Sequence, residues 1–194
     1  MEYTYIHNHQ SQFLEMLKGN SNNMCLSDIS QSISKGITPK YVDQSNILVI
    51  NQACVNWGSL DFSKVKYHNE DVTYTKGILH RDDILLTMTG RGTLGRCNIF
   101  NPQNQGKTYI ADGHISIIRL DNEILLPELF TAYIALSDTQ NEIYRNYVTG
   151  STNQLDIVFS EIQQMPIPIP EMVRQKAYVD IVRQADKSKY YEIN

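Results

Sequence analysis

Residues 147–171 read YVTGSTNQLDIVFSEIQQMPIPIPE, and this stretch does more than any other to decide the fold. A glycine followed by Ser, Thr and Asn, as at Gly150, is typical of a helix end and the turn after it. The prolines of residues 166–170 exclude a helix and a central strand, because proline fixes φ and lacks an N–H donor. We therefore expect one helix to end at Gly150 and another to start at Glu171.

Residues at helical spacing flank this stretch on both sides. A helix that opens at Pro127 would carry one mostly apolar stripe, because these residues recur three and four apart: Leu129, Tyr133, Leu136, Gln140, Ile143 and Tyr147. Beyond Glu171 a second, coiled-coil-like stripe cannot be buried by a single short helix. It predicts an interface with a partner helix, formed by Tyr178, Ile181, Val182 and Ala185.

The chain before Pro127 has the pattern of strands. Short apolar or alternating runs lie between Gly, Pro and Asn turns at residues 47–50, 83–89 and 115–120, whereas residues 10–18 have the spacing of a short helix. The predicted fold class is therefore α+β, a compact, mostly-β domain with packed helices and a C-terminal coiled-coil-like helix. We expect an N-terminal helix and linker over 1–23, the domain over 24–170 and the C-terminal helix over 171–194.

Composition limits the classes of protein to consider. The 194 residues are 41% hydrophobic, which suits one substantial core. No apolar run is long enough for a membrane span, and the first residues do not resemble a signal peptide, so we expect a cytoplasmic protein. The three cysteines form no Cys-x-x-Cys pair, and they predict neither a disulfide framework nor a zinc site.

Charge is distributed unevenly. The net charge is −4, yet residues 34–119 carry ten Lys or Arg against seven Asp or Glu, a balance of +3 that leaves −7 elsewhere. A middle that faces phosphates and a last third that faces another protein would produce this asymmetry. Chance segregation of solvated charges would produce it equally well.

The most enzyme-like motif is a Gly-x-Gly-x-x-Gly pattern at residues 90–95, which follows a predicted strand. A dinucleotide site also needs a helix directly after the glycines, whereas residues 96–100 have the pattern of another strand. We interpret the segment as a hairpin-like loop whose glycines adopt positive φ. The same loop would bring basic and hydroxyl side chains to a DNA backbone: Arg91, Thr93 and Arg96.

Other candidates for catalysis are incomplete. Residues 101–104 read NPQN and lack the second proline and the aromatic ring of an adenine methyltransferase motif. Asp112 and His114 have no nucleophile or orienting residue beside them, and Asp82 with Asp83 suggests a solvated turn rather than a metal site. We predict no catalytic residue and no metal ligand in this chain.

Two segments resemble the DNA-specificity (S) subunit of type I restriction-modification enzymes. One is the ordered series of Gly-Ser-Thr loop, short apolar segment, Ile-Pro-x-Pro run and Gln-bearing helix described above. The other is DILLTMTGRGTLGR at residues 83–96, which is similar to the family's strand and glycine loop. Together the matches run from about Leu26 to Lys187.

The resemblance implies a single target-recognition domain without catalysis of its own. Such a domain reads one half of a split double-stranded DNA target and docks the methyltransferase (modification) subunit and the restriction subunit. S-adenosylmethionine and ATP with Mg would belong to those partners, and this chain would bind no cofactor. The usual family member has two recognition domains, so this chain would be a half-size subunit that forms a homodimer, or a single cassette. An adaptor or inhibitor that binds only the modification subunits is the alternative.

The predicted DNA contacts lie on several loops that we expect to converge on one face. Lys and Arg suit phosphates, amides can pair bidentately with adenine, and small hydroxyl or amide side chains can donate to phosphates and base edges. Three candidates come from a Gly-x-Thr-Pro loop like the family's, three follow the apolar run at 47–50, and the rest lie on the glycine loop, near Asp112 and after Gly150. They are Lys35, Thr38, Lys40, Asn51, Gln52, Trp57, Arg91, Thr93, Arg96, His114, Ser151, Thr152 and Asn153.

Overall fold

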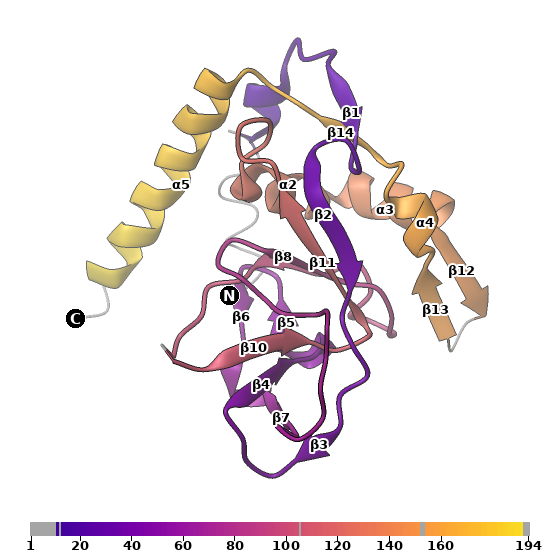
Figure 1. Ribbon diagram of the computed structural model, residues 1–194. Coiled ribbons are helices and arrows are strands. Elements are labelled where there is room, and N and C mark those ends of the chain that lie inside the picture. Colours follow the sequence, from indigo (N-terminus) through magenta and orange to yellow (C-terminus); the bar gives the residue numbers. More distant parts are fainter. Residues whose placement is uncertain (1–10, 12, 105, 152–153, 192–194) are drawn as a thin grey trace.

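The computed structural model describes residue 11 and residues 13–104, 106–151 and 154–191, with side chains up to residue 184 (Figure 1). The strands are β1 (Asn23–Cys25), β2 (Ser30–Lys35), β3 (Tyr41–Val42), β4 (Ile47–Ile50), β5 (Val55–Asn56), β6 (Ser59–Leu60), β7 (Lys66–His68), β8 (Ile84–Thr87), β9 (Cys97–Ile99), β10 (Thr108–Ala111), β11 (Ile115–Leu120), β12 (Val148–Ser151), β13 (Gln154–Ile157) and β14 (Pro166–Pro168). The helices are α2 (Pro127–Ile134), α3 (Ser137–Asn146), α4 (Phe159–Ile162) and α5 (Met172–Tyr191), with 3₁₀ turns η1 (Gln52–Cys54) and η2 (Phe62–Lys64).

A central sheet with the order β2-β11-β8-β9 lies between two apolar layers. Successive side chains of a strand point to opposite faces, and here both faces are buried. On β8, Ile84 and Leu86 join a core on the helix side, whereas Leu85 joins a core on the opposite side. Ile118 and Ile117 of β11 divide in the same way. This double burial explains why β8 and β11 are almost continuously apolar in sequence.

The second sheet, with the order β10-β4-β7-β3, covers the side of the central sheet away from the helices. β10 runs parallel to β4, whereas β7 pairs antiparallel with both β4 and β3. Phe100 and Tyr109 fill the space between the two sheets, with their rings edge to face at 5.1 Å. This part forms the lower half of the molecule in Figure 1.

The helices on the other side differ from the single helix that we expected between Pro127 and Gly150. α2 ends at Ile134, and α3 begins at Ser137 after an extended Leu136. Gly150 is not a helix cap, because it lies within the hairpin of β12 and β13 with φ at +110°. A Cβ atom there would come within 1.9 Å of the carbonyl oxygen of Gln154, so only glycine fits.

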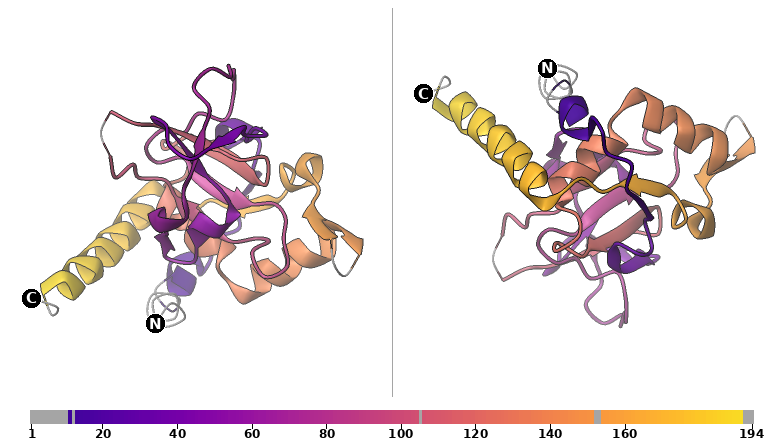
Figure 2. Two further views of the ribbon diagram at one scale, coloured as in Figure 1. Left: turned by 90° about the horizontal axis from the view of Figure 1, so that it is seen from below. Right: turned by 90° about the horizontal axis from the view of Figure 1, so that it is seen from above.

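Segments near the two ends of the described chain pair with each other. β1 pairs antiparallel with β14, and the prolines of β14 lie in a two-stranded ribbon rather than in a central strand. The helical residues 13–17 pack near the start of α5, where the rings of Phe13 and Tyr178 meet edge to face at 5.4 Å. Figure 2 shows the rest of α5 standing away from the body.

This packing changes the predicted partner-helix interface. Tyr178 is buried inside its own chain, so it is not available to a partner helix. Val182 is half-buried against the helix-side core, and Ile181 is 44% exposed. The side chain of Ala185 lies outside the described residues. Of the predicted stripe, Ile181 therefore remains as the exposed candidate for contact with a partner.

The α+β class predicted from the sequence is confirmed. Strands make up most of the body, helices pack on one side of the central sheet, and a long helix ends the chain. In the part of the chain that the structure describes, no helix is both long enough and apolar enough to cross a membrane.

Candidate nucleic-acid interface

Several loops leave the central sheet at one end. β11 is antiparallel to β2 and β8, and β9 is antiparallel to β8, so the ends at Lys35 and Thr87 and the starts at Cys97 and Ile115 lie together. The loops after β2, between β8 and β9, and before β11 therefore emerge side by side. We call this end of the sheet, with these three loops and the β12–β13 hairpin, the loop end.

Backbone hydrogen bonds hold these loops to one another. Gly36 donates its N–H to the carbonyl of Ile115 at 3.0 Å, and Met88 donates to the carbonyl of His114 at 2.8 Å. The β12–β13 hairpin joins them, because Ile157 donates to the carbonyl of Met88 at 2.8 Å and Asp156 forms a bridge with Thr89. The segments that carry Lys35, Arg91 and Ser151 are thus joined to one another at the loop end.

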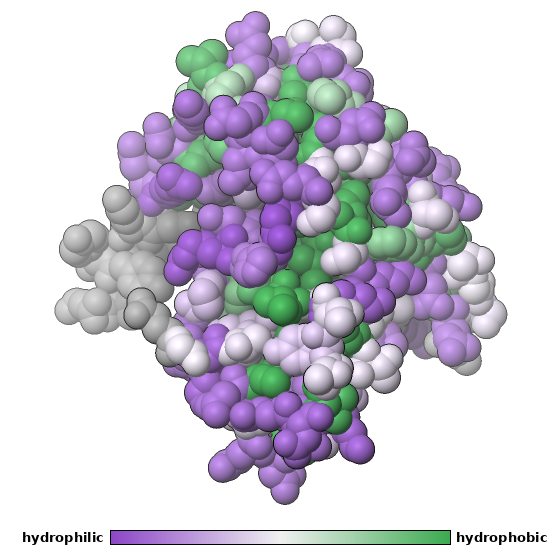
Figure 3. All heavy atoms as spheres, viewed as in Figure 1, coloured by the Kyte–Doolittle hydropathy of each residue, from purple (hydrophilic) through white to green (hydrophobic). Residues whose placement is uncertain are grey.

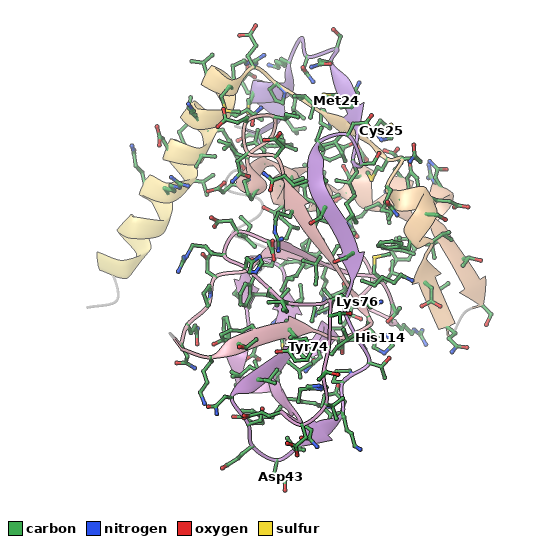
Figure 4. All side chains as sticks on the ribbon, in the orientation of Figure 1. Met24, Cys25, Asp43, Tyr74, Lys76 and His114 are labelled. Atoms are coloured by element: carbon green, nitrogen blue, oxygen red, sulfur yellow. The ribbon has the colours of Figure 1, made fainter. Side chains whose placement is uncertain are left out.

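Four polar side chains meet at this end, and we call them the polar cluster: Gln52, Thr89, Thr93 and His114. The hydroxyl of Thr89 lies 2.8 Å from Nδ1 of His114 and 3.3 Å from Oε1 of Gln52. The hydroxyl of Thr93 donates to the carbonyl of Thr89 at 3.0 Å and lies 3.4 Å from the same Oε1. His114 is exposed, and Figure 4 shows it on the side of the body that carries the hairpin.

Several basic side chains lie on the loops that leave this end of the central sheet. Lys35 is exposed, and its Nζ lies 5.2 Å from the centre of the Phe159 ring at the start of α4. Arg91 is exposed at the tip of the glycine loop. Lys40 is exposed on the loop after β2, where its backbone N–H donates to Nδ1 of the buried His68 at 3.0 Å. Thr38 is exposed on the same loop.

The glycine loop has the conformation that the sequence predicts. Gly90, Gly92 and Gly95 all have positive φ, and β9 rather than a helix follows them. No helix therefore begins directly after the glycine loop, where a dinucleotide phosphate would need one. The absence of a side chain at Gly90 lets the amide of Gln52 approach the loop, because a Cβ atom there would come within 2.7 Å of Oε1.

Three predicted contacts are engaged in the structure of the domain itself. Asn51 is buried, its Oδ1 caps η1 through the N–H of Ala53, and its Nδ2 donates to the carbonyl of Lys64, so we withdraw it as a DNA contact. Trp57 is half-buried and packs against the helix-side core. The guanidinium of Arg96 is half-buried and donates to Oδ1 of Asn56 at 2.9 Å.

Ser151 is exposed at the end of β12, and Thr152 and Asn153 lie outside the described residues. The predictions missed Thr89, which joins His114 to Gln52, and Lys76, an exposed cation beside the same end. Lys76 is placed there because its neighbour Gly77 accepts the N–H of Ala111 at 2.9 Å. No sequence pattern indicates either role, since both depend on contacts between distant segments.

The expectation of a solvated turn at Asp82 and Asp83 is correct for Asp82 and wrong for Asp83. Asp82 is exposed with φ at 68°. Asp83 is fully buried, and its two carboxylate oxygens accept hydrogen bonds from the guanidinium of Arg119 at 2.7 and 2.8 Å. The same carboxylate accepts the N–H of His80 at 2.7 Å. Asp83 therefore has a structural role in the central sheet, and no group of His, Cys, Asp or Glu suited to a metal occurs among the described residues.

Asp112 is the buried acid nearest the polar cluster. Burial raises the pKa of its carboxyl, against the lowering effect of the hydrogen bond that it accepts from the N–H of His114 at 3.0 Å and of the charge on Lys66. Because the folded pKa lies above the unfolded one, the unfolded chain ionises first as pH rises. Above the folded pKa the carboxylate is ionised and destabilises the fold. Below the unfolded pKa it is protonated in both states and does not.

This effect can be tested with Asp112→Asn, which keeps Oδ1 for the N–H of His114. We expect the variant to be more stable than the wild type at pH 7, and we expect the difference to shrink as pH falls toward the unfolded pKa of about 4. Urea unfolding of both proteins at pH values from roughly 4.5 to 7.5 measures this difference in stability. A difference that does not change with pH would contradict the assignment.

The space-filling view shows the character of the surface on the side seen in Figure 1. Hydrophilic residues cover its upper and lower parts, and hydrophobic residues gather mainly in the middle (Figure 3). Exposed large hydrophobic side chains in this lower half include Tyr41, whose ring lies 4.7 Å below Nζ of Lys66. Hydrophilic and hydrophobic residues thus both reach the surface on this side.

The fold is that of type I restriction-modification S subunits. The HsdS subunit from Thermoanaerobacter tengcongensis matches with a TM-score of 0.64 at 14% identity, over 96% of this chain and 44% of that one. The S subunit from M. genitalium matches with a TM-score of 0.56 at 17% identity, over 89% and 41%. A chain from a structure of type I R-M complex assembly and conformational transition matches at 0.60 and 14% identity, over 96% and 47%.

The sequence places the chain more narrowly than its fold does. The family described as "Type I restriction modification DNA specificity domain" matches residues 18–193, and the chain belongs to this family. It spans less than half the length of each of the three solved chains that it resembles. A search of curated proteins found no match.

Proposed function

We propose that this protein recognises one half of a DNA target for a type I restriction-modification system, and that the loop end is the surface that meets the duplex. The observation that carries the proposal is the convergence at one end of the central sheet of the polar cluster with Lys35, Arg91 and Lys76. Cations bind the phosphates and position the protein, whereas the polar side chains discriminate among bases.

We assign the other activities of such a system to partner subunits. We propose that α5, with Ile181 exposed, meets a helix of a partner or of a second copy of this chain, and that the methyltransferase and restriction subunits assemble on this scaffold. S-adenosylmethionine and ATP would bind to those subunits, and this chain would bind no cofactor and catalyse no reaction. Membership of a specificity-domain family supports this division.

Binding of the full chain to mixed-sequence duplexes at increasing salt tests the function. The logarithm of the binding constant falls linearly with that of the salt concentration, and the slope grows with the number of phosphates contacted. We expect Lys35→Gln and Arg91→Gln each to reduce the slope by about 1 and to weaken binding to all duplexes alike. Fluorescence anisotropy with a labelled duplex measures the slope.

The matched control is Lys176→Gln, since Lys176 is exposed on α5 and away from the loop end. It should leave the slope unchanged. Failure of the wild-type chain to bind any duplex at low salt, together with tight binding to the modification subunit, would favour the adaptor alternative. Equal effects of all three substitutions would contradict the placement of the interface.

A further inference from the structure

The side chain of Gln52 is held in one orientation by its neighbours. Its Oε1 faces two hydroxyls, those of Thr89 at 3.3 Å and Thr93 at 3.4 Å. Among the described residues, Nε2 of Gln52 has no hydrogen-bond acceptor, and the side chain is half-buried. An amide whose oxygen faces inward presents its two N–H donors outward.

Glycine at position 90 makes this orientation possible. A Cβ atom on Gly90 would lie 2.4 Å from the Thr93 hydroxyl and 2.7 Å from Oε1 of Gln52, too close for either atom to stay in place. The positive φ of +98° at this residue also disfavours a side chain. The glycine loop thus leaves room for the amide oxygen of Gln52, which lies 38 positions earlier in the chain.

With Oε1 facing inward, the Thr89 hydroxyl is the group that can donate to it, because the proton of the Thr93 hydroxyl goes to the carbonyl of Thr89. A hydroxyl has one proton, so it can donate either to Oε1 of Gln52 or to Nδ1 of His114, 2.8 Å away. When Nδ1 carries a hydrogen, the imidazole donates to Thr89, and Thr89 donates to Gln52. His114 is itself exposed, but its backbone is fixed by the bond from its N–H to Oδ1 of Asp112.

We propose that Gln52 is a base-reading residue of the loop end and that Thr89 positions it as a donor, so that it selects guanine. In the major groove guanine presents two adjacent acceptors, N7 and O6, whereas adenine presents one acceptor and one donor. A glutamine that reads adenine uses both ends of its amide, and here Oε1 is already engaged. This inference rests on the proposed function and adds the base and the residue that reads it.

Selection of bound duplexes from a randomised pool tests the inference with the full chain. We expect the wild type to enrich a motif with G at one of its positions. Gln52→Ala should lower the preference for G at that position by about tenfold. Thr89→Val should free the amide to turn, so that adenine is accepted at that same position. Thr89→Ser keeps the hydroxyl and should keep the preference for G.

The outcomes separate this inference from the function. If the wild type binds no duplex, or binds without enriching any motif, the proposed function fails and the inference with it. If a motif is enriched but Gln52→Ala alters none of its positions, only the inference fails. Selection of adenine at the affected position by the wild type would overturn the donor role of Gln52. Circular dichroism of each variant confirms that the fold is retained.

Discussion

Replacing Asp83 by alanine is expected to lower the free energy of unfolding by about 3 kcal/mol, because it removes one partner of a buried ion pair. The carboxylate is fully buried and accepts both the guanidinium of Arg119 and the N–H of His80. The guanidinium side is 34% exposed, so water can solvate part of what is left unpaired, and the cost should be at the lower end for buried pairs. Urea denaturation followed by circular dichroism gives the value.

The neighbouring acid supplies the control. Asp82 is exposed and has positive φ, a conformation that asparagine tolerates, so Asp82→Asn should change stability by less than about 0.5 kcal/mol. Arg119→Met should cost at least as much as Asp83→Ala, since it leaves a carboxylate buried without a counter-charge. A loss below about 1 kcal/mol for Asp83→Ala would contradict the structural role of the pair.

Gln175→Leu is expected to cost about 3 kcal/mol as well, because three hydrogen bonds depend on one buried amide. Its Oε1 accepts the N–H of Leu126 at 3.0 Å, and its Nε2 donates to the carbonyls of Ile124 at 2.9 Å and Pro170 at 2.8 Å. Leu126 precedes α2, which has no side-chain cap of its own. The substitution should therefore weaken the attachment of α5, detected by faster proteolysis within α5 and by a lower urea midpoint.

Two further variants distinguish hydrogen bonding from packing at this position. Gln175→Glu keeps the acceptor for Leu126 but places a carboxylate against two carbonyl oxygens, so it should cost as much as the leucine variant. Lys176→Leu changes the next, exposed residue of the same helix and should be nearly neutral. Wild-type stability in Gln175→Glu would show that shape alone matters there.

The sequence predicted the central strands well, because burial on both faces of the sheet requires apolar runs. Such runs can be recognised without knowing the tertiary contacts. It failed where a distant side chain changes local structure. Gln140 has the spacing of an apolar helical stripe, yet its Nε2 donates to the carbonyl of Ile134, where α2 ends, at 2.8 Å and lies 3.3 Å from the carbonyl of Gly95. The break between α2 and α3 therefore depends partly on a contact 45 residues away.

The candidate site was predicted only in outline, from local features of the sequence. Glycine spacing indicated a loop after β8, and residue type indicated which side chains suit phosphates and bases. Nothing in the sequence showed that the side chain of Asn51 caps η1, or that the hydroxyl of Thr89 contacts both Gln52 and His114. Those facts depend on which segments the two sheets bring together, and only three-dimensional structure supplies them.

The pairing of β1 with β14 has a consequence for how the body of the domain can be joined to other chain segments. Because the strand that enters the unit lies against the strand that leaves it, the points of attachment to any surrounding chain are neighbours. A segment joined in this way can be transplanted or duplicated at a surface site with little strain on its host.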